Sequence, residues 1–224
     1  MKTIFPIFSI TILALYSLSA CTQEESNKQT QQLTTKATKA FKNGDYTLAV
    51  QLSEQACNAG DANSCSNLGV LYLAGKGVKQ DYAQAAKFLE QACNGGIANS
   101  CFNLGALYSK GMGVEQDYTK AAKLYEQACN VSDANACNNL GGLYSEGKGV
   151  KQDYTQAAKL HEQACNAGIA IACSNLASSY VKGLGVEKDI EKAAELYTKA
   201  CDDGDKDACL LVNTGKELIK QISN

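Results

Sequence analysis

Residues 62–93 read ANSCSNLGVLYLAGKGVKQDYAQAAKFLEQAC, and this stretch decides the fold. Its first half places apolar or small residues at the spacing of one helical face, at Cys65, Leu68, Gly69 and Tyr72. Paired glycines then follow at Gly75 and Gly77, which suits a left-handed helix end and a turn. A second amphipathic run follows Asp81, a candidate N-cap. The stretch therefore predicts a helical hairpin.

This hairpin recurs every 36 residues. The cysteines mark the period as five Cys-x7-Cys pairs, at 57 and 65, 93 and 101, 129 and 137, 165 and 173, and 201 and 209. A fixed period of this length indicates a solenoid. We expect an all-α fold, a right-handed α-solenoid of about five helix-turn-helix repeats. Four full repeats span 61–204, between an N-terminal capping hairpin at 33–60 and a C-terminal capping helix at 205–224.

The ten repeat cysteines predict a disulfide framework, because thiols oxidise outside the cytoplasm. Repetition favours local pairing across the turn between successive hairpins, as Cys57–Cys65, Cys93–Cys101, Cys129–Cys137, Cys165–Cys173 and Cys201–Cys209. A metal site is disfavoured, since zinc sites use shorter Cys-x(2–4)-Cys spacing. The single histidine, His161, occupies the position of Leu89, Tyr125 and Tyr197 in the other repeats, so we expect it to serve in packing rather than in metal binding or catalysis.

The amino terminus carries an export pattern. Lys2 precedes an apolar stretch at 4–18, which ends in Leu18-Ser19-Ala20-Cys21 and resembles a bacterial lipobox. We expect residues 1–20 to be a lipoprotein signal peptide, Cys21 to be lipidated, and the polar residues 21–32 to form a flexible tether. The predicted location is the bacterial cell envelope, lipid-anchored in the outer membrane and facing the periplasm, with the cell surface or exterior as the alternative.

Charge and composition exclude several partners. The 21 basic residues are all Lys and are balanced by 23 acidic ones, with no basic run. Nucleic acid is therefore not an expected partner. Without Arg, the chain also lacks the planar guanidinium group that binds phosphate through two parallel hydrogen bonds. The Gly-x-Gly segments fit turns rather than a phosphate loop, which needs a longer motif after a strand. No cofactor is predicted.

The repeated unit resembles the Sel1-like repeat family. The residues that carry the resemblance are Ala62, Asn67, Leu68, Gly69, Leu71, Tyr72, Gly75, Gly77, Val78, Asp81 and Ala85. Units beginning at Ala98, Ala134 and Ala170 repeat the pattern, although Ala177 and Ser179 replace its Gly and Leu in the last unit. The cysteine pairs narrow the resemblance to the Helicobacter cysteine-rich protein type. It implies a tetratricopeptide-like solenoid whose first helices line a concave surface.

Asparagines are expected on that concave surface, opposite the apolar face of each first helix, at Asn63, Asn67, Asn99, Asn103, Asn135, Asn139 and Asn175. Repeats stack about 10 Å apart, and an extended peptide rises about 3.3 Å per residue. An Asn ladder can therefore meet every third peptide amide. The alternative is that these side chains bond to neighbouring helices and stabilise the superhelix.

These observations favour a non-catalytic scaffold that binds a peptide or protein segment, with peptidoglycan fragments as a second ligand class. The resemblance also implies an alternative, a weak β-lactamase or penicillin-binding protein. Ser-x-x-Lys occurs at Ser145–Lys148 and at Ser179–Lys182, but neither Ser-Asp-Asn nor Lys-Thr-Gly is present. No activating base or oxyanion hole can be assigned to either serine. We therefore predict no catalytic residue.

Overall fold

A computed structural model describes residues 8–222 of the chain, and the side chains of residues 24–214. Residues 8–222 form helices and connecting turns, with no strand. The helices are α1 (Phe8–Lys42), α2 (Tyr46–Asn58), α3 (Ala62–Ala74), α4 (Tyr82–Asn94), α5 (Ala98–Lys110), α6 (Tyr118–Asn130), α7 (Ala134–Glu146), α8 (Tyr154–Asn166), α9 (Ala170–Lys182), α10 (Ile190–Asp202) and α11 (Lys206–Ile222).

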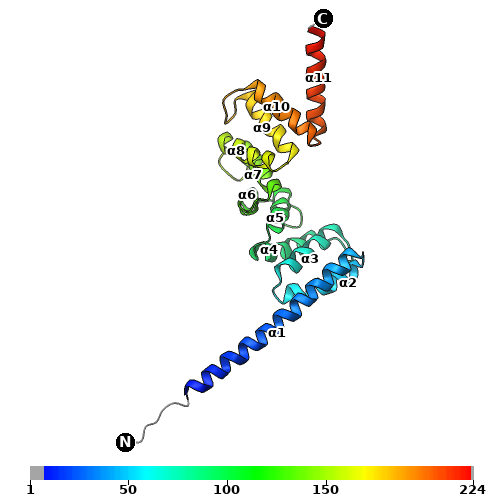
Figure 1. The fold of residues 1–224 in the computed structure, drawn as a ribbon, viewed down its shortest axis with the longest axis vertical. Helices are drawn as coiled ribbons and strands as arrows, with labels where there is room; N and C mark the ends of the chain where they lie inside the picture. Colours follow the sequence, from blue (N-terminus) through cyan, green and yellow to red (C-terminus); the bar gives the residue numbers. More distant parts are fainter. Residues whose placement is uncertain (1–7, 223–224) are drawn as a thin grey trace, which may run out of the picture.

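Successive helices pair as hairpins, and the hairpins stack along the long axis of the molecule (Figure 1). In each of the four central hairpins the odd-numbered helix comes first, and we call α3, α5, α7 and α9 the A helices. Each hairpin packs mainly on the hairpins before and after it in the chain. Helices α1 and α11 lead away from opposite ends of the stack (Figure 1). The predicted all-α solenoid is therefore confirmed.

The turn inside each hairpin is determined by a few residues. Gly75 ends α3 in a left-handed conformation with a φ of 64°, and the Asp81 carboxylate begins α4 by accepting from the Ala83 and Gln84 amides. Between them, Gly77 lies directly on the first turn of α2, and a Cβ there would clash with the Tyr46 backbone. Gly113, Gly149 and Gly185 repeat this contact. The second glycine of each turn thus packs one repeat on the preceding one.

Close approach within the hairpins depends on small residues. A Cβ added to Gly69 would lie 2.7 Å from the Leu89 Cγ of α4, too close for the two helices as they stand. Gly105 and Gly141 approach α6 and α8 in the same way. Ala177 takes this position in α9. The core between the helices is built mainly from Ala, Leu and Cys, so the solenoid is thin and each hairpin relies on its neighbours.

The amino-terminal region is helical over a long stretch. Residues 21–32, for which the sequence predicted a flexible tether, belong to α1 in the structure. The segment lacks Pro and Gly, and Thr30 and Thr35 donate to the carbonyls four residues earlier, so nothing in it interrupts the helix. The Cys21 side chain lies outside the described residues. In the part of the chain that the structure describes, no helix is both long and apolar enough to cross a membrane.

Candidate functional site

Five disulfides join the hairpins. They are the predicted pairs, Cys57–Cys65, Cys93–Cys101, Cys129–Cys137, Cys165–Cys173 and Cys201–Cys209, with Cα atoms 4.5 to 4.8 Å apart. Each links the end of one hairpin to the first turn of the next helix. Cross-links of this kind persist in oxidising compartments, so the disulfides point to an exported protein. Each disulfide also fixes an even-numbered helix to the odd-numbered helix that follows it.

Neighbouring A helices are linked by polar side chains. Ser100 donates to Ser66 at 2.8 Å, joining α5 to α3, and the Asn175 amide donates to Asn138 Oδ1 at 3.1 Å, joining α9 to α7. The Asn138 amide lies 3.4 Å from Asn139 Oδ1. Three asparagine side chains from two A helices therefore form one hydrogen-bonded row.

A cavity of about 380 Å³ opens beside this row and is lined by residues of α5, α7 and α9 together with Tyr118 and Tyr125 of α6. We call it the A-helix cavity. Its lining residues are Phe102, Ala106, Ser109, Lys110, Tyr118, Tyr125, Asn138, Asn139, Gly142, Leu143, Glu146, Lys148 and Asn175. Aromatic rings and amides thus line the same space, and the charged groups come from the carboxyl ends of α5 and α7 and from the turn after α7.

The aromatic side is ordered by ring contacts. The Phe102 and Tyr125 rings have centroids 6.0 Å apart, and the Tyr125 hydroxyl lies 3.4 Å from Ser109 Oγ. Lys148 Nζ lies 5.5 Å from the centre of the Tyr118 ring and pairs with Glu146 at 2.6 Å. A hydrogen bond to Glu146 raises the pKa of Lys148, so this side chain is a cation at neutral pH.

Only two of the predicted groove residues line the A-helix cavity, Asn139 and Asn175. The other five, Asn63, Asn67, Asn99, Asn103 and Asn135, lie elsewhere, and Asn103 donates to Asn99 at 2.8 Å. Sequence reasoning missed Asn138, since its position holds Ser66, Phe102 and Ser174 in other repeats. When the repeats are aligned, this position varies from repeat to repeat. That variation is the sequence signal that could have marked Asn138 as a candidate binding residue.

The two Ser-x-x-Lys segments do not form a nucleophile and base. Ser145 Oγ donates to the Gly142 carbonyl at 2.8 Å, and Ser179 Oγ donates to the Asn175 carbonyl at 3.2 Å. Because Lys148 is a paired ammonium, it cannot accept a proton from Ser145. The geometry of these serines is that of helix residues bonded to their own backbone.

Solved structures similar to this chain share the repeat architecture. A protective antigen of uropathogenic Escherichia coli strains, which displays an SLR fold, matches with 28% identity and a TM-score of 0.78 over 83% of this chain and 41% of that chain. A Sel1 repeat protein from Oxalobacter formigenes matches with 27% identity and a TM-score of 0.74, over 81% of this chain and 74% of that chain.

Helicobacter pylori cysteine rich protein B is 30% identical over 61% of this chain and 98% of its own length, with a TM-score of 0.48. This chain spans less than half of the E. coli antigen. No curated protein matches the chain.

The Sel1 repeat model matches residues 40–61, 62–97, 98–133, 134–169 and 170–205. Four of the matched units are full 36-residue repeats, and the first lies mostly within the predicted capping hairpin at 33–60. Units two to five begin at the first residues of the four A helices, α3, α5, α7 and α9. The chain therefore belongs to the Sel1 repeat family.

Proposed function

We propose that the chain is a non-catalytic scaffold of the bacterial envelope that holds an extended peptide or protein segment on its A-helix face. Sel1 repeat solenoids are typical protein-binding scaffolds, which supports the class of function. The observation that carries the finer proposal is the A-helix cavity, where Asn138, Asn139 and Asn175 meet an aromatic wall. The proposal includes the lipid anchor at Cys21, which would hold the solenoid at the outer membrane.

The chemistry of the cavity matches a peptide. Each Asn amide can donate to a peptide carbonyl and accept from a peptide N–H, so one row can engage successive backbone amides. Phe102 and Tyr118, which are partly exposed, offer apolar surface to a side chain beside that backbone, and the buried Tyr125 ring packs behind Phe102. Peptidoglycan stem peptides fall within the same chemistry.

Binding to synthetic peptides tests the proposal directly. An array of defined decapeptides would be screened with the oxidised protein, and the peptides that bind would be measured by fluorescence anisotropy. We expect Asn138→Ala with Asn175→Ala to weaken binding at least tenfold, because both amides line the cavity. Asn135→Ala is the matched control, since Asn135 is exposed on the same A helix but outside the cavity.

Equal loss in the Asn135→Ala control, or undiminished binding in the double variant, contradicts the proposal. Thermal unfolding of each variant shows whether its fold is retained. The β-lactamase alternative has no supporting geometry, since Ser145 and Ser179 bond to helix carbonyls.

A further inference from the structure

Among the four disulfides that are followed by another hairpin, one differs in the side chain that covers it; Cys201–Cys209 joins α10 to α11 and has no following hairpin within the residues that the structure describes. The covering residue comes 26 positions after the second cysteine of the pair and lies on the even-numbered helix that follows. Gln91 places its amide oxygen 3.2 Å from Cys57 Sγ and 3.7 Å from Cys65 Sγ, and the Gln127 oxygen lies 3.6 Å from Cys93 Sγ. Gln163 has the same place in the next repeat, but Lys199 has it in the last.

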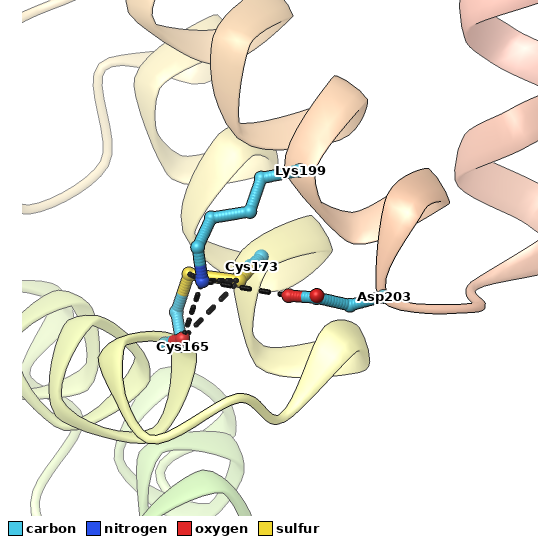
Figure 2. Close-up of polar contacts among 4 residues, drawn as sticks. All are labelled: Cys165, Cys173, Lys199 and Asp203. Carbon is cyan, nitrogen blue, oxygen red and sulfur yellow. Dashed lines mark hydrogen bonds and ion pairs between the residues drawn. A yellow bond between two sulfur atoms is a disulfide. The ribbon is translucent and has the colours of Figure 1, made fainter.

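Lys199 is held over both sulfurs of Cys165–Cys173. Its Nζ lies 3.8 Å from Cys165 Sγ and 3.7 Å from Cys173 Sγ, and it donates to the Cys165 carbonyl at 2.8 Å. Figure 2 shows the side chain reaching from α10 to the disulfide between α8 and α9, with Asp203 beside it at 3.5 Å. Asp203 is itself a departure, because Ala59, Gly95 and Ala167 occupy its position elsewhere.

A cation at this place acts mainly on the reduced state. Opening a disulfide produces thiolate, and a neighbouring ammonium stabilises thiolate over thiol. The two sulfurs are buried, at 1% and 0% exposure, while the Lys199 side chain is 45% exposed, so water screens part of its charge. At Cys57–Cys65 and Cys93–Cys101 the Gln91 and Gln127 amide oxygens present a partial negative charge instead and give no such support. Reduction is therefore favoured at Cys165–Cys173 relative to the interior sisters.

We propose that Cys165–Cys173 is a redox-responsive disulfide, which exchanges with a dithiol such as a Cys-x-x-Cys protein, while Cys57–Cys65, Cys93–Cys101 and Cys129–Cys137 stay structural. A reductant thiolate attacks one sulfur, the S–S bond breaks, and its electron pair leaves on the other sulfur as a thiolate beside Lys199. The second thiol of the reductant, as its thiolate, then attacks the reductant's own sulfur in the mixed disulfide and releases the remaining protein sulfur, and water supplies the protons that the protein thiolates take up. The products are two protein thiols and the oxidised dithiol.

The disulfide lies close to the A-helix cavity along the chain. Asn175, which bonds to Asn138 in the cavity, follows Cys173 by two residues on α9. Reduction removes the disulfide cross-link between α8 and α9 and leaves that junction to the backbone turn at 167–169 and to packing. If the proposed binding function holds, the redox state of this junction sets how firmly Asn175 is placed. The redox chemistry itself does not depend on that function.

The test measures each disulfide at equilibrium, because burial of the two sulfurs slows attack and makes rates a poor guide. The full oxidised chain is equilibrated in graded buffers of reduced and oxidised dithiothreitol, the thiols are alkylated, and each cysteine pair is quantified by peptide mass spectrometry. We expect the equilibrium constant for reduction to be about tenfold larger at Cys165–Cys173 than at Cys93–Cys101, equal to about 30 mV for this two-electron couple.

Two reciprocal variants separate the effect of Lys199 from that of position along the solenoid. Lys199→Gln, which restores the sister residue, should bring Cys165–Cys173 to the value of its sisters, and Gln127→Lys should raise the constant at Cys93–Cys101. Asp203→Ala should raise it further at Cys165–Cys173, since the ammonium loses its carboxylate partner. An unchanged constant in Lys199→Gln, or opening of Cys165–Cys173 only when helical circular dichroism is lost, overturns the proposal.

Discussion

The hairpin of α5 and α6 and the hairpin of α7 and α8 share one backbone design but fill it with different side chains. In both, a glycine of the A helix lets the partner helix approach, Gly105 in one and Gly141 in the other. Tyr125 faces Gly105 and His161 faces Gly141, and both rings are buried, at 3% and 4% exposure. The Tyr125 hydroxyl lies 3.4 Å from Ser109, whereas neither ring nitrogen of His161 makes a hydrogen bond of normal geometry, although the Asn138 backbone lies near enough to favour its charged form.

The difference shows that the position facing the A-helix glycine requires a side chain of suitable shape, whereas the polarity of that side chain can vary. Leu89 fills it in the preceding hairpin, and the helices keep the same length and spacing pattern in all three. An unpaired buried polar group costs about 1 to 3 kcal/mol, a cost that Leu89 and Tyr125 avoid. Three changes follow from the comparison, in order of decreasing expected effect.

The glycines give the largest effect. Gly105→Val and Gly141→Val should each lower the free energy of unfolding by about 3 kcal/mol, because even a Cβ would lie 2.9 Å from the Tyr125 ring or 2.7 Å from the His161 ring. Urea unfolding followed by circular dichroism measures the loss. Gly142→Ala is the control, since its Cβ would meet nothing within 4 Å, and it should stabilise α7 by about 0.5 to 1 kcal/mol. A Gly141→Val protein as stable as the parent would refute the close-approach argument.

His161 makes the second hairpin sensitive to pH. Burial lowers the pKa of His161 in the folded protein, whereas in the unfolded chain it titrates near 6.5. The unfolded state therefore binds more protons below that value, so the stability present above pH 6.5 is lost as the pH falls toward the folded pKa. One titrating group can change the free energy of unfolding by at most about 1.4 kcal/mol per pH unit. We therefore expect this free energy to fall by about 1 kcal/mol between pH 7 and pH 5.5.

Exchanging the two rings tests this assignment. His161→Tyr should remove the pH-dependent loss, and Tyr125→His should introduce one in the first hairpin. Urea unfolding at pH 7 and pH 5.5 gives the comparison. Retention of the full pH dependence in His161→Tyr would assign it to other groups.

The turn between the two hairpins gives the smallest effect. Ser132 has a φ of 72°, and among the described residues it is the one non-glycine with a positive φ. Glycine holds the equivalent place at Gly60, Gly96, Gly168 and Gly204. Ser132→Gly should stabilise the chain by about 0.5 to 1 kcal/mol, since relief of strain exceeds the added freedom of the unfolded chain. Thermal unfolding measures the gain, and Gly96→Ser should show the opposite shift. A lower unfolding temperature in Ser132→Gly would contradict backbone strain at Ser132.

Much of this architecture could be predicted because it is local. The first helix of the hairpin at 62–93, ending before Gly75, was predicted and is α3, and Asp81 was predicted as the cap that the structure shows. Both depend on residues within one turn of each other. The pairing of the cysteines follows from their short separation, which leaves few alternatives in a repeated chain.

The cavity was predicted less well because it depends on three A helices at once. Asn139 and Asn175 were predicted from their helix face, yet Asn138 beside them was missed, and five predicted asparagines lie outside the cavity. For residues 21–32, polar composition predicted a flexible tether, whereas the structure places them within helix α1.

The sequence by itself determined the period, the helical hairpins, the glycine turns and the disulfide pairs, because each arises from residues close together in the chain. The tertiary structure alone decided which asparagines share a cavity, that Lys199 covers Cys165–Cys173, and that His161 is buried without a hydrogen bond of normal geometry. These contacts join different helices, so they depend on the distance and rotation between neighbouring helices, which no single repeat specifies.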